Sequence, residues 1–94
     1  MSLAGSGNSR YNDFTAINVS VTGQCEATVT ISASVSGSGN YAYITIGGVT
    51  KTYSSGTYTL TGTVDGNGRV IAGGHASNDS FVNVSASATI KAVG

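Results

Sequence analysis

The residue types that carry out acid–base or covalent catalysis are scarce in this chain of 94 residues. It holds one histidine, one cysteine and four carboxylates. The carboxylates lie in four separate segments, so local spacing places no pair for glycoside hydrolysis: Asp13, Glu26, Asp65 and Asp79. Because proton transfer and nucleophilic attack need titratable groups that converge, we predict that the protein is not an enzyme.

Two tyrosines, Tyr41 and Tyr43, are the most informative residues in the chain. The diglycine Gly47-Gly48 that follows them is typical of a type I′ hairpin, which would pair the segments on either side. Aromatic rings among hydroxyls can stack on the apolar face of a sugar or anchor a protein interface. The alternative is that tyrosines simply favour strands. In the expected register the predicted ligand-binding residues share one face: Tyr41, Tyr43, Thr45, Thr50 and Thr52.

The opposite face of this hairpin is predicted to be its core side. The pairs expected there are mostly apolar, with Lys51 as an inward-leaning charge on an edge strand. Its members are Ala42, Ile44, Ile46, Val49, Lys51 and Tyr53.

The remaining reactive residues are each predicted to have structural roles. Cys25 continues the apolar alternation of its strand, so we interpret it as a small buried hydrophobe. His75 is expected to be partly buried and hydrogen-bonded, on the same face as Ile71 and Leu60. The segment 65–68, Asp-Gly-Asn-Gly, is interpreted as a hairpin turn and not as the start of a calcium loop. A single cysteine excludes an internal disulfide and a zinc site with several thiolates, and we predict neither a metal nor a cofactor.

The elements that must position these residues are strands. Apolar and polar residues alternate almost throughout, and no segment has the 3.6-residue period of a helix. The Ser77-Asn78-Asp79-Ser80 cluster is expected to form the last turn. We predict an all-β, single antiparallel sandwich of about seven strands, immunoglobulin-like with a jelly roll as the alternative, after a flexible N-terminal arm. The arm covers residues 1–13 and the sandwich 14–94, with strands at 15–22, 25–36, 41–46, 49–54, 57–64, 69–75 and 82–91.

Charge and composition narrow the range of partners. Only 9% of the residues are charged and the formal net charge is zero, so there is no basic surface for nucleic acid or for an anionic membrane. Gly, Ser and Thr make up 40 of the 94 residues, yet 39% of the chain is hydrophobic, which is enough for a packed core.

The layout of strands around a central Gly-Gly hairpin resembles the immunoglobulin-like and fibronectin-like sandwiches of cell-surface proteins and phage virions. The resemblance covers about residues 14–92, without the Trp and paired Cys of antibody domains. The segment 36–53, SGSGNYAYITIGGVTKTY, is similar to stretches of phage tail and capsid-decoration proteins and of bacterial carbohydrate-binding modules.

The residues and this resemblance lead to two hypotheses for the function. The first is a non-enzymatic structural protein of a phage virion, a capsid-decoration or tail-associated domain that associates with copies of itself or with other virion proteins. A flexible N-terminal arm could reach a neighbour, and a surface with few charges is suited to association. The alternative is a carbohydrate-binding module or adhesin domain that binds glycans on its tyrosine face. The expected location is the virion in the first case and the cell surface or extracellular space in the second.

Overall fold

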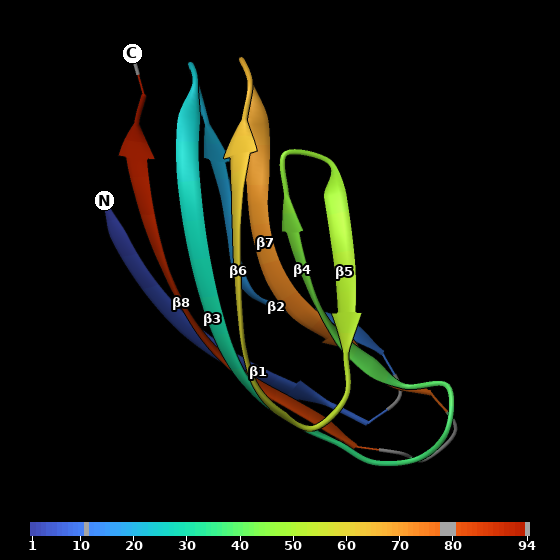
Figure 1. Cartoon of the computed structure of the whole chain (residues 1–94). Coiled ribbons are helices and arrows are strands. Elements are labelled where there is room, and N and C mark those ends of the chain that lie inside the picture. Colours follow the sequence, from blue (N-terminus) through green and yellow to red (C-terminus); the bar gives the residue numbers. More distant parts are fainter. Residues whose placement is uncertain (11, 78–80, 94) are drawn as a thin grey trace.

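The computed structural model describes residues 1–10, 12–77 and 81–93, which form strands joined by turns and loops (Figure 1). Within these ranges no helix is long and apolar enough to cross a membrane. The predicted turn at residues 77–80 lies mostly outside the described residues. The strands are β1 (Ser2–Ser9), β2 (Asp13–Val21), β3 (Cys25–Val35), β4 (Tyr41–Ile46), β5 (Val49–Tyr53), β6 (Gly56–Val64), β7 (Gly68–His75) and β8 (Val82–Ala92).

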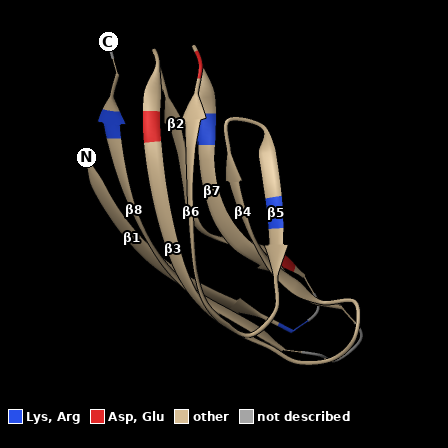
Figure 2. Cartoon of the chain, viewed as in Figure 1, with Lys and Arg blue, Asp and Glu red and all other residues tan. Residues whose placement is uncertain are grey.

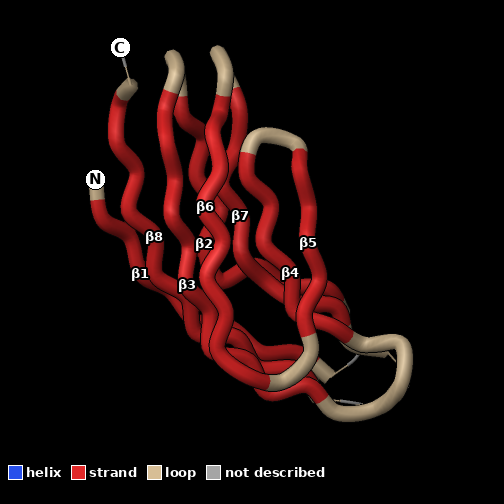
Figure 3. The backbone as a smooth tube through the Cα atoms, in the orientation of Figure 1, coloured by secondary structure: helices blue, strands red, loops and turns tan. Residues whose placement is uncertain are grey.

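The strands form two antiparallel four-stranded sheets, packed as a sandwich in the orders β1-β8-β3-β6 and β2-β7-β4-β5 (Figure 3). Strands pair from the two ends of the chain inward, β1 with β8, β2 with β7, β3 with β6 and β4 with β5. This is the eight-stranded, two-sheet pattern of a jelly roll. An immunoglobulin domain instead pairs its first strand with its second. The predicted all-β antiparallel sandwich is therefore confirmed, with the strand order of the alternative fold.

The N-terminal segment that we predicted to be a flexible arm forms strand β1 at an edge of its sheet. It pairs with β8 from Ser2 opposite Thr89 to Ser9 opposite Val82. Two of its inward positions are Gly5 and Gly7, and a Cβ on Gly5 would lie 2.0 Å from the Ala16 carbonyl oxygen. The backbones of β1 and β2 therefore pack closely. Glycines at inward positions remove the apolar alternation by which a strand is recognised, which is why the prediction was wrong for residues 2–9.

The core lies between the sheets and follows the predicted alternation. Ile31 of β3 is 0% exposed and Val84 of β8 is 1% exposed, whereas Ser32 and Ser85, which follow them, face solvent. Cys25 is buried with the apolar residues, as expected. Burial of one face of the central strands thus accounts for how the two sheets pack.

The Asp-Gly-Asn-Gly segment at residues 65–68 is not a hairpin turn. It connects β6 in one sheet to β7 in the other. The predicted common face of Leu60 and His75 is therefore wrong, because Leu60 packs against the core while His75 lies on the outer face of its own sheet. Alternation shows which residues of one strand share a face, but it does not show which strands pair.

The hairpin of β4 and β5 has the predicted register. Gly47 and Gly48 both have positive φ values, 58° and 87°, as a type I′ turn requires. The predicted core side holds for β4, whose three inward residues are buried. For β5 it holds only for Tyr53, which packs against the core, because Val49 is 60% exposed and Lys51 is also exposed. β5 is an edge strand of its sheet, and an exposed lysine there discourages pairing with further strands.

Candidate functional site

A hollow of about 270 Å³ opens on the outer face of the β2-β7-β4-β5 sheet. Strands β4 and β5 contribute aromatic rings and hydroxyls, and the adjoining ends of β2 and β7 contribute a carboxylate and an imidazole. All five residues predicted from the sequence line it, together with two that were not predicted. The lining residues are Asp13, Tyr41, Tyr43, Thr45, Thr50, Thr52 and His75.

The register of the hairpin brings the five predicted residues together. Tyr43 lies opposite Thr52, and Thr45 lies opposite Thr50, with 2.8 Å between the Oγ1 atoms of the two threonines. Tyr41 is 36% exposed, and Tyr43 is half-buried. Because strand residues two apart point to the same side, these side chains form one continuous surface on paired strands.

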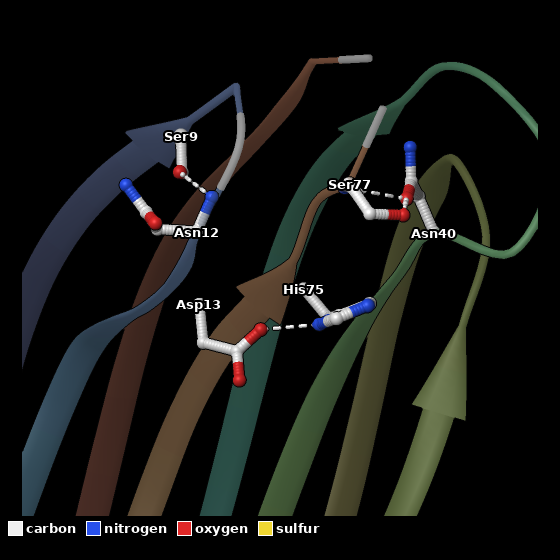
Figure 4. Close-up of polar contacts among 6 residues, drawn as sticks. All are labelled: Ser9, Asn12, Asp13, Asn40, His75 and Ser77. Atoms are coloured by element: carbon white, nitrogen blue, oxygen red, sulfur yellow. Dashed lines mark hydrogen bonds and ion pairs between the residues drawn. The ribbon is translucent and has the colours of Figure 1, made fainter. Parts of the chain in front are cut away.

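Asp13 and His75 meet at one end of the hollow (Figure 4). Asp13 is the first residue of β2 and His75 the last of β7, and the two are register partners. The Nδ1 atom of His75 is hydrogen-bonded to Oδ1 of Asp13. Since a carboxylate only accepts, this nitrogen carries the proton, and the contact fixes the orientation of the ring. The ring also stacks on Tyr41, with centroids 5.1 Å apart and planes at 25°.

His75 matches the prediction of a half-buried, hydrogen-bonded histidine, but its place beside the hollow was missed. Asp13 was missed as a site residue altogether. The two are 62 positions apart in the chain, and only the pairing of β2 with β7 brings them together. Neither residue type nor spacing in the sequence carries a signal for that pairing.

The hollow also affects the acidity of Tyr43. Its pKa lies above the usual value, because burial disfavours the phenolate, with further contributions from the negative charge of Asp13 and from Tyr41. The phenol of Tyr43 therefore stays protonated at neutral and mildly alkaline pH. In that form it can both donate and accept a hydrogen bond.

The groups around the hollow are ones that can bind a ligand. The cysteine lies buried in the core, away from the hollow. In the described ranges no group of three or more His, Cys, Asp and Glu side chains is placed to hold a metal ion. What the hollow offers is two rings, three threonine hydroxyls, one carboxylate and one imidazole on a rigid sheet.

Neither a scan against protein-family models nor a search of curated proteins finds a match to this chain.

Proposed function

We propose that the protein is a non-catalytic carbohydrate-recognition module and that the hollow on the β2-β7-β4-β5 sheet is its ligand site. The observation that carries this proposal is the gathering of Tyr41, Tyr43 and three threonine hydroxyls around one hollow. A sugar ring has an apolar face that stacks on aromatic rings and a rim of hydroxyls that needs donors and acceptors. The lining supplies both kinds of contact.

The dimensions of the site favour a small ligand. Tyr41 and Tyr43 are two residues apart on one strand, which separates their Cα atoms by roughly 6.5 Å. The volume of about 270 Å³ lies just below the usual range for pockets that enclose a drug-sized ligand. A single sugar ring, or the tip of a glycan, fits this hollow better than a long polysaccharide.

Loss of the Tyr43 ring is expected to weaken glycan binding about fivefold or more, or by about 1 kcal/mol or more, because one stacking contact and one hydroxyl are lost. The measurement is titration of a glycan identified on an array, with wild type and Tyr43→Ala compared. Phe81→Ala is the control, since Phe81 is an exposed aromatic residue that does not line the hollow. An array without hits, or equal losses in the two variants, contradicts the proposal.

A second candidate function, association of many copies as a virion component, has support from the other sheet. The strands of the β1-β8-β3-β6 sheet carry only two charged residues, Glu26 and Lys91, which are register partners at one end of the sheet (Figure 2). Between that end and the loops, outward-facing small residues form three rows across the sheet: Ser2, Thr89, Thr28 and Thr61; Ala4, Ser87, Thr30 and Thr59; and Ser6, Ser85, Ser32 and Thr57.

This uncharged hydroxyl face, the twelve residues of those rows, is suited to contact with another protein surface. Side-chain hydrogen bonds hold it in order, such as the 3.0 Å contact between the Oγ1 atoms of Thr30 and Thr59. A shallow hollow of about 240 Å³ lies at its centre, over β3 and β8. A surface with few charges resists association less than an ordinary charged one. The N-terminal segment no longer supports this candidate, because residues 2–9 pair within the sheet and are not a free arm.

A lysine placed at the centre of the hydroxyl face is expected to block association. Wild-type protein should scatter light as an oligomer, or bind capsid or tail particles in negative-stain images, and Thr30→Lys should abolish either result. A buried, unpaired charge costs several kcal/mol, enough to dissociate a weak assembly. Thr50→Lys, on the opposite sheet, controls for the added charge. A monomeric wild type that binds no such particle contradicts this second function.

A further inference from the structure

We propose that Asp13 is the polar anchor of the hollow and that its carboxylate makes the site select uncharged sugars over acidic ones. This inference rests on the proposed function and names the class of glycan that the same site takes.

The position of Asp13 leaves one of its two carboxylate oxygens for a ligand. His75 engages Oδ1 from one side, and the second oxygen points away from the imidazole (Figure 4). The side chain is 74% exposed although it borders the hollow. The hydrogen bond to His75 limits rotation of the carboxylate, so less entropy is lost when a ligand binds. A sugar hydroxyl that donates to this oxygen forms a charge-assisted hydrogen bond, which is stronger than a neutral one.

The charge of the residues that line the hollow sets its preference for uncharged over acidic sugars. Among the described residues around the hollow there is one carboxylate and neither lysine nor arginine. His75 can balance that charge only when it is protonated, so the described lining holds no permanent positive charge. The carboxylate of Asp13 repels a sugar carboxylate or sulfate placed beside it. The described lining residues include no lysine or arginine that could pair with such a ligand.

The field of Asp13 reaches across the hollow to the ring on which a ligand would stack. Its charge is one of the causes that raise the pKa of Tyr43, after burial. An anion held against Tyr43 would experience the same repulsion as the phenolate. An uncharged sugar would not, and the neutral phenol could donate a hydrogen bond to it.

The test compares ligands that differ by one charge. Methyl glucoside and methyl galactoside are titrated beside methyl glucuronide and methyl galacturonide at pH 8 and low salt. We expect the neutral member of the preferred pair to bind about tenfold more tightly, since the acidic member is repelled by the carboxylate of Asp13. Asp13→Asn keeps the size of the side chain and should reduce the preference to about twofold or less. Asp65→Asn, which removes a carboxylate outside the hollow, should leave it unchanged.

A second measurement needs no ligand. The alkaline titration of tyrosine absorbance, with Tyr43→Phe to identify the Tyr43 component, should show a lower Tyr43 pKa in Asp13→Asn. The value should stay above that of an ordinary tyrosine, because burial is the larger cause.

The outcomes separate the two proposals. If sugars bind but the acidic member binds as well or better, or if Asp13→Asn leaves the preference unchanged, the role of Asp13 is wrong and glycan recognition stands. If no sugar binds to the wild type at millimolar concentration, glycan recognition at this hollow is wrong and the selectivity falls with it. If the pKa of Tyr43 is unchanged in Asp13→Asn, the charge of Asp13 does not act on Tyr43, and this part of the proposal is wrong.

Discussion

Truncation of Ile31 or Val84 to alanine is expected to lower the free energy of unfolding by about 2 to 4 kcal/mol. Both side chains are completely or almost completely buried between the sheets. Each substitution deletes methyl groups and leaves a cavity that the surrounding strands cannot fill. A domain of this size has a stability of roughly 5 to 10 kcal/mol, so a single truncation removes a large share of it.

The matched controls are the neighbouring residues on the other side of the same strands. Thr30→Ala and Ser85→Ala are expected to cost under about 1 kcal/mol, since they remove an outward hydroxyl and some strand propensity. Chemical denaturation of the four variants gives the comparison. If the outward changes prove as damaging as the inward ones, the hydroxyl face is covered in solution, which would favour association over glycan recognition.

Gly73→Ala is expected to destabilise the protein by about 1 to 3 kcal/mol and to distort the ligand hollow. A Cβ at Gly73 would lie 2.1 Å from the Phe14 carbonyl oxygen and 3.0 Å from the Cα of Thr15. Gly73 pairs with Thr15 next to the register shift in β2, and it pairs with Tyr43 on its other side. The backbone of β2 must therefore move to accept even one methyl group.

Gly66→Asn serves as the comparison for Gly73→Ala. Gly66 has a φ of 76°, and a Cβ added there would meet nothing within 4 Å. Asparagine tolerates such a φ better than other side chains do. Denaturation should show a small loss for Gly66→Asn and a large one for Gly73→Ala, with glycan affinity reduced only in the latter. Equal stability of the two variants would mean that β2 does not approach Gly73 so closely.

Local sequence determined which faces of the strands are buried. The alternation in β3 and β8 predicted the burial of Ile31 and Val84, and Gly47-Gly48 predicted the register of β4 with β5. That register was enough to predict five of the residues that line the hollow. These features depend on residues close together in the chain, where side-chain period and turn chemistry decide the outcome.

The pairing of distant strands was decided only by the tertiary structure. β1 was missed because Gly5 and Gly7 occupy inward positions, where close backbone packing takes the place of apolar side chains. The turn at residues 65–68 connects two sheets, although its residues are equally suited to a hairpin. Asp13 and His75, which are 62 positions apart in the chain, meet because β2 pairs with β7. Alternation has the same form whichever partner a strand takes, so the strand order, and with it the charge in the hollow, is set by how the two sheets bury their apolar faces together.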